Sequence, residues 1–154
     1  MPSTIISDAS CFVLLAKIDS LQLLADVYGS VVTTPEVQAE VRFQLPDWVT
    51  IQSASSPDKV RELALKVDLG EASAIALALE IPDSTLILDD LGARKLAENL
   101  GLEITGTIGV ILKAKTDNKI PAIAPLLRAI RRTNFRLSQH VEAEALLLAG
   151  ESLD

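Results

Sequence analysis

The sequence has very little cysteine, histidine or aromatic character. Among its 154 residues there is one cysteine, one histidine, and 3% of the residues are aromatic. The lone Cys11 excludes a disulfide within the chain and is typical of a reducing compartment. His140, the single imidazole, cannot build a zinc site or a catalytic triad by itself. The core must therefore consist of Leu, Ile, Val and Ala side chains.

Long apolar runs and glycine-rich phosphate loops are also missing. No apolar run approaches the roughly 20 residues that cross a bilayer. The chain does not open with a basic segment followed by an apolar one, as a signal peptide does. No glycine pattern of the P-loop or dinucleotide-binding type is present. We therefore expect a cytoplasmic protein with no membrane partner.

Positive charge is in short supply. Lys and Arg number 14 against 21 Asp and Glu, which gives a net charge of −7. Such a chain does not attract nucleic-acid phosphates by bulk charge. If the substrate is a nucleic acid, bound cations or local basic groups must supply the positive field. One local basic cluster is either a solvated helix face or a phosphate contact; it contains Arg128, Arg131, Arg132 and Arg136.

Strand patterns alternate with helical patterns along the whole chain. The alternation predicts an α/β fold with a mainly parallel sheet and helices on both faces. The length predicts one domain over residues 1–154. Strands are predicted at residues 3–7, 31–33, 48–52, 85–88 and 103–105. Helices are predicted at 11–17 with Ser10 as cap, and at 20–28, 35–43, 58–67, 71–80, 91–100, 106–114, 121–132 and 138–149. The helix over 71–80 is apolar almost all round, so we expect it to be buried.

Two adjacent carboxylates, Asp89 and Asp90, directly follow the apolar strand over 85–88. In open α/β sheets, ligands bind outside the carboxyl ends of the strands. Two like charges side by side repel each other unless a positive group joins them. A divalent cation would satisfy this requirement.

Three further acids stand near element ends. Asp8 follows the first strand and is as well explained as a helix cap as it is by metal binding. Glu40 lies on a helix, where a solvated face is the usual explanation, and Glu36 one turn earlier competes with it. Glu71 in the first turn of a helix is accounted for by the helix dipole. Together, however, these positions suit Mg²⁺, which takes oxygen ligands, and two such ions can clamp a phosphodiester displacement.

Several short motifs resemble those of the PIN domain family. Four of them carry the acids: residues 7–10, 34–41, 70–78 and 88–94. Others are similar to a prokaryotic branch of PIN-like proteins: Gly101-Leu102, Thr105–Val110, Ala114-Lys115, Asn134–Ser138 and Ala149–Glu151. The resemblance is ordered along nearly the whole chain.

This resemblance implies a three-layer α/β/α sandwich and a Mg²⁺- or Mn²⁺-dependent ribonuclease, often the toxin of a toxin–antitoxin pair. The family's acids fall on Asp8, Glu40 and Glu71, and the fourth on Asp90 or Asp89. These residues are the expected catalytic and metal-binding residues. RNA is the expected substrate and an antitoxin protein an expected partner, and we expect a homodimer.

The chain departs from the family pattern at two places. Glu71 stands where many PIN domains have Asp, and Leu88 or Ile87 stands where a Thr or Ser often precedes the fourth acid by two residues. An alternative function is therefore a binding module for RNA or a protein that cuts little. An aspartyl-phosphate receiver or phosphatase is disfavoured, because the stretch after Asp8 lacks a second carboxylate.

Overall fold

The computed structural model describes residues 4–152. Five short strands form one sheet in the order β3-β2-β1-β4-β5, and all four neighbouring pairs are parallel. Their bounds are β1 Thr4–Ser7, β2 Val31–Thr33, β3 Val49–Ile51, β4 Ser84–Ile87 and β5 Ile104–Thr105. The predicted parallel α/β architecture is confirmed.

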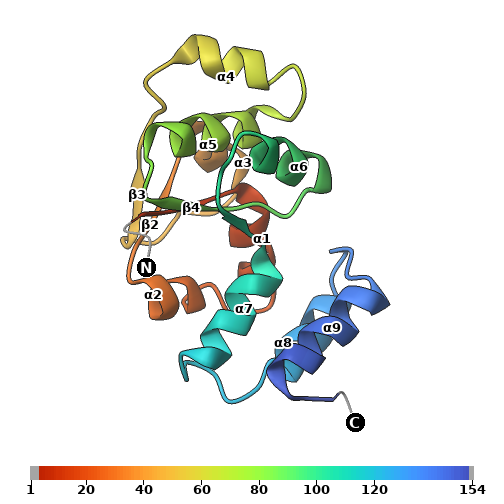
Figure 1. The fold of residues 1–154 in the computed structure, drawn as a ribbon. Helices are drawn as coiled ribbons and strands as arrows, with labels where there is room; N and C mark the ends of the chain where they lie inside the picture. The colour runs from red at the N-terminus through yellow and green to blue at the C-terminus, as the bar shows by residue number, and fades with distance from the viewer. Residues whose placement is uncertain (1–3, 153–154) are drawn as a thin grey trace.

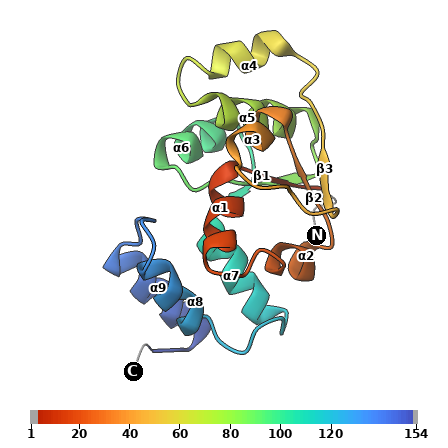
Figure 2. The ribbon, with the colours of Figure 1, turned by 180° about the vertical axis from the view of Figure 1, so that it is seen from behind.

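Helices cover both faces of this sheet, which gives the three layers (Figure 1). One face packs against α5 (Leu69–Glu80) and α6 (Leu91–Asn99), and α4 (Pro57–Leu63) packs on the outer side of α5. On the other side lie α1 (Ala9–Lys17), α2 (Leu23–Tyr28) and α7 (Thr107–Thr116). The short α3 (Pro35–Glu40) follows β2 and packs against α5. Finally, α8 (Ala124–Arg131) and α9 (Gln139–Ala149) pack beside α1 and α7, as seen from behind in Figure 2.

Successive strand residues point to opposite faces and so build two cores. Ile5 belongs to the core beneath α1 and α7, whereas Ile6 belongs to the core beneath α5. Leu86 and Ile87 alternate in the same way on β4. Because both faces are covered, these strands are apolar on both sides, as parallel strands usually are.

Helix α5 is buried, as its sequence predicted. Eight of its residues are buried, among them Ile75, which is fully inaccessible. The helix begins at Leu69 rather than Glu71, because Asp68 caps it and Glu71 bonds back to the Asp68 N–H. This reciprocal arrangement is a capping box.

Other predicted boundaries were wrong by a few residues. Helix α1 begins at Ala9 rather than at residue 11, and its cap is Asp8, as one of the two explanations of that residue predicted, rather than Ser10. Helix α3 ends at Glu40 rather than near residue 43, and α2 begins at Leu23 rather than near residue 20. Helix α4 ends at Leu63, short of residue 67. Ser56 caps α4 and Ser138 caps α9 through their side chains, and glycines with positive φ follow α2 and α9.

The C-terminal helices are tied together by two polar contacts. Arg131 of α8 forms a two-pronged ion pair with Glu142 of α9, with N–O distances of 2.6 and 2.7 Å. Glu151 accepts hydrogen bonds from Lys115 of α7 and from the first N–H groups of α8. These contacts fix where the segment between α8 and α9 lies. Among residues 4–152, no helix has the length and apolar character that crossing a membrane requires.

Candidate active site

Asp8 stands directly after β1, at the carboxyl edge of the sheet. Its Oδ1 accepts a hydrogen bond from the Cys11 N–H at 3.0 Å, which caps α1. Its Oδ2 accepts from the Asp89 N–H at 3.1 Å. The residue is only 2% exposed. A carboxylate has about four acceptor directions, so both oxygens still have acceptor capacity after capping.

Asp89 and Asp90 accept hydrogen bonds from the first turns of two different helices. Asp89 accepts from the Thr107 N–H at 2.8 Å and from the Thr107 hydroxyl at 2.6 Å. Asp90 instead caps α6 by accepting from the Ala93 N–H at 3.0 Å. Asp89 is therefore held at the start of α7, toward Asp8.

The other two predicted acids lie around the start of α5. Glu71 closes the capping box with Asp68. Glu40, the last residue of α3, accepts from the Gly70 N–H at 3.2 Å. Glu36, the competing residue one turn earlier, makes no side-chain hydrogen bond or ion pair with any described residue. The first turn of α5 thus brings Glu40 and Glu71 to one place.

Burial, followed by the like charge of neighbouring carboxylates, raises the pKa values of three of these acids. Burial first, and then the charge of Asp89, raises the pKa of Asp8 from 3.8 to about 8; Glu71 adds a smaller effect. Burial first, and then Asp68 and Asp90, raises the pKa of Glu71 from 4.5 to about 7. The pKa of Glu40 is also raised, by burial and by Asp68. Full ionisation of the carboxyl groups at this edge of the sheet is therefore unfavourable without a positive group beside them.

Among the described residues, no basic side chain forms an ion pair with these carboxylates. Six ion pairs occur within residues 4–152, and none includes any of the five predicted acids. No three His, Cys, Asp or Glu side chains in that range stand at the spacing of a formed metal site. Mg²⁺, however, usually takes only one or two carboxylates, with water and substrate phosphate completing its shell. By charge and ligand type, this donor set fits a hard divalent cation.

Comparison with known families agrees with this geometry. The family model DUF3368, described as a PIN domain, matches residues 4–151. The chain belongs to the PIN domain family. PIN domains are generally nucleases and typically use divalent metal ions. No curated protein matches the chain.

In this PIN domain, the hydroxyl group beside Asp89 comes from the start of α7 and not from the strand that precedes Asp89. Leu88 and Ile87 carry no hydroxyl, as the sequence already indicates. Thr107, which is fully buried at the start of α7, instead donates its hydroxyl to Asp89. Sequence inspection missed this residue, although a Gly-Thr pair directly after the last strand is a recognisable helix start.

Two more residues of the site were not predicted from the sequence. Asp68 lies between the predicted helices over 58–67 and 71–80, yet its charge acts on both Glu40 and Glu71. The spacing Asp-x-x-Glu was the available signal. Gly70 leaves the space that Glu40 occupies, because a Cβ there would lie 2.5 Å from Oε1 of Glu40.

The remaining candidates have structural or surface roles. Cys11 is fully buried, and burial raises the pKa of its thiol far above its usual value. His140 is exposed and faces Glu144 on the same helix. Within the basic cluster, Arg131 is used by the ion pair to Glu142, whereas Arg136 lines a groove beside Asp89.

Proposed function

We propose that this PIN domain is a Mg²⁺- or Mn²⁺-dependent endoribonuclease. The proposal rests chiefly on one observation: the buried Asp8 carboxylate lies against Asp89, and no described basic side chain pairs with either. Family membership supports a nuclease. When bound, divalent ions activate water and offset the charge that develops on phosphate oxygens.

The side chains would hold such ions without forming a covalent intermediate. Two main-chain N–H groups fix the orientation of Asp8, and Thr107 fixes Asp89. The charge of Asp90 acts on Glu71 and contributes to its raised pKa. Asp8 and Asp89 are therefore the proposed principal ligands, with Glu71, Asp90 and Glu40 completing the negative edge.

The biological setting proposed is a cytoplasmic toxin–antitoxin pair. RNA would be the substrate, an antitoxin protein would cover the acidic cleft, and the active form would be a homodimer. The net charge of −7 favours a basic partner segment over the acids. These assignments follow the family resemblance and go beyond the fold itself.

Cleavage of a mixed-sequence RNA pool tests the proposal. The chain should be purified under denaturing conditions and refolded, so that no copurified antitoxin blocks the cleft. We expect cleavage with Mn²⁺ or Mg²⁺ and none with EDTA. A refolded protein that binds the pool but cuts nothing with either metal would indicate the alternative, a PIN-like binding module.

A further inference from the structure

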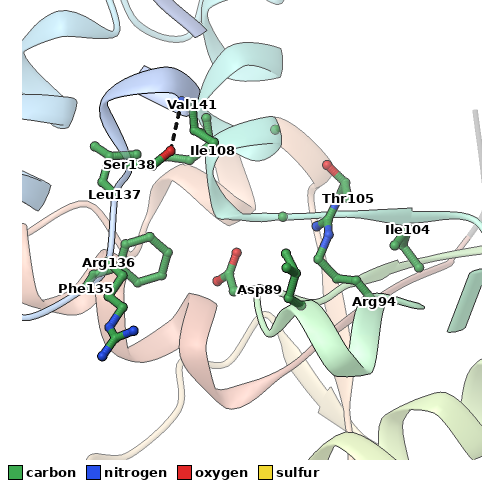
Figure 3. Close-up of a pocket in the computed structure, with 13 residues that line it drawn as sticks. Asp89, Arg94, Ile104, Thr105, Ile108, Phe135, Arg136, Leu137, Ser138 and Val141 are labelled. Atoms are coloured by element: carbon green, nitrogen blue, oxygen red, sulfur yellow. Dashed lines mark hydrogen bonds between the residues drawn. The ribbon is translucent and has the colours of Figure 1, made fainter. Parts of the chain in front are cut away.

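A groove of about 980 Å³ opens directly beside Asp89. One wall comes from α6 and β5, and the other from the segment between α8 and α9 together with the start of α9 (Figure 3). Its charged lining residues besides Asp89 are Arg94 and Arg136, and Phe135 is its only aromatic lining residue. Asp89 is the residue that this groove shares with the site already described.

The two arginines stand on opposite walls. Arg94 donates to the Leu88 carbonyl at 2.7 Å, which holds its guanidinium near Asp89. Arg94 Nη1 and Asp89 Oδ1 both lie close to Gly106, because a Cβ on that residue would be 2.9 Å from the first atom and 3.0 Å from the second. Arg136 is exposed and makes no hydrogen bond or ion pair within the described part of the chain. Both guanidinium groups are therefore available to an anionic ligand.

Phe135 presents its ring to the same space. In Figure 3 it lies beside Arg136 and faces Asp89. Phe135 also lines a smaller hollow that includes Glu40, so it stands between two of the predicted acids. The chain has only five aromatic residues, and Phe12 is buried in the core.

We infer that this groove binds one nucleotide of single-stranded RNA next to the scissile phosphate. The base stacks on Phe135, and the flanking phosphates contact Arg136 and Arg94. This inference rests on the proposed nuclease function. It also answers the charge problem of an acidic chain, because it places positive charge where the RNA backbone must run past the carboxylates.

The chemistry of the walls favours a nucleotide. Aromatic stacking and arginine contacts are the usual means of binding single-stranded nucleic acid without strong sequence preference. Leu91 and Val141, exposed to 69% and 43%, add apolar surface for a base or ribose face. The volume lies in the range of small-ligand pockets.

The segment that carries Phe135 and Arg136 is held in place before any ligand binds. Asn134 accepts a hydrogen bond from Lys17 of α1 at 2.9 Å. The Phe135 N–H donates to the Thr133 hydroxyl at 3.1 Å. The Arg131–Glu142 ion pair anchors the two helices on either side. Ordering this wall therefore costs little when RNA binds.

Binding of a fluorescent mixed-sequence 12-nucleotide RNA, in EDTA and at several salt concentrations, tests the groove apart from catalysis. Phe135→Leu keeps apolar packing but removes the ring, and should weaken binding about tenfold. Phe135→Tyr should restore it. Arg136→Gln should weaken binding and reduce the salt slope by about one. Arg132→Gln, an exposed arginine outside the groove, is the matched control and should bind like the parent.

Parent-like binding by both Phe135→Leu and Arg136→Gln, with unchanged melting temperatures, would overturn the inference. A parent that binds no RNA at all would overturn it too, and would leave a peptide as the occupant. Cleavage assays separate this from the proposed function. A parent that binds through the groove but never cuts would refute only the nuclease proposal. A parent that cuts, with KM unchanged in Phe135→Leu, would refute only the groove.

Discussion

The main-chain N–H of Asp89 donates a hydrogen bond to the Asp8 carboxylate at 3.1 Å. This bond continues the pairing of β1 with β4 past the ends of both strands. It fixes Asp8 but also places the Asp89 charge beside it. The two N–H donors lower the pKa of Asp8, yet burial and the Asp89 charge outweigh them and raise it to about 8. In the metal-free protein, these hydrogen bonds keep Asp8 beside Asp89 although the two carboxylate charges repel each other.

Stability without metal should therefore fall as pH rises. The pKa values of Asp8 and Glu71 in the folded protein, about 8 and about 7, lie above their ordinary values of 3.8 and 4.5. Between those limits the folded state binds more protons than the unfolded state, so the free energy of unfolding decreases with pH. We expect a lower melting temperature at pH 8.5 than at pH 5.5 in EDTA.

Asp8→Asn provides the control for this pH dependence. The amide cannot ionise, so the variant should lose the part of the decline that extends to about pH 8 and keep the part from Glu71 that ends near pH 7. At pH 8.5 it should melt at or above the parent temperature. An equal decline in both proteins would show that Asp8 is not the titrating group.

Divalent metal should stabilise the folded protein. An ion that binds only the folded site raises the melting temperature by mass action. Because the carboxyl groups must lose protons first, millimolar Mg²⁺ or Mn²⁺ should have a larger effect at pH 8 than at pH 5.5. Potassium chloride of equal ionic strength is the control. A melting temperature that shifts no more with metal than with this salt would contradict the metal site.

Thr107→Val tests what the Thr107 hydroxyl contributes to stability apart from the packing of the side chain. The substitution keeps nearly the same shape but removes the donor to Asp89, whose bond is 2.6 Å long. A hydrogen bond to a charged acceptor contributes about 1.5–3 kcal/mol. We expect a comparable loss in the free energy of unfolding, measured with urea at pH 7. Loss below about 0.5 kcal/mol would mean that the hydroxyl does not support Asp89.

The burial of α5 has its own test. Ile75→Asp places an unpaired charge at a fully buried position and should lower the free energy of unfolding by more than about 3 kcal/mol. Leu65→Asp is the matched control, since Leu65 is 88% exposed. That variant should unfold within about 0.5 kcal/mol of the parent. Equal free energies of unfolding for the two variants would contradict the packing of α5 against the sheet.

Local signals in the sequence predicted most of the architecture. The apolar stretch before Asp89 marks β4, and the near-continuous apolar pattern around Ile75 marks a buried helix. Both depend on residues close in sequence. Boundaries were less accurate between neighbouring helices: residues 68–70 were left between the predicted helices over 58–67 and 71–80, whereas the Asp68 carboxylate caps a helix that begins at Leu69.

The site was less predictable because its contacts join distant segments. Asp8 meets Asp89 only because β1 pairs with β4, 81 residues later. Thr107 reaches Asp89 because β5 lies beside β4. The approach of Phe135 to this edge requires the packing of α8 and α9. No local pattern encodes these three relationships.

In the proposed function, the carboxylates at this edge of the sheet would hold metal ions, which would supply activated water for RNA cleavage. Cleavage of a mixed RNA pool by the refolded parent and by Asp8→Asn, each with Mn²⁺, Mg²⁺ and EDTA, tests that mechanism most directly. Asp8→Asn keeps the shape of the side chain but removes one negative charge from the ions. We predict metal-dependent cleavage by the parent, and loss of most of it in a variant whose metal-free melting temperature is equal or higher. Cleavage that survives EDTA, or that Asp8→Asn leaves intact, would contradict the carboxylate mechanism.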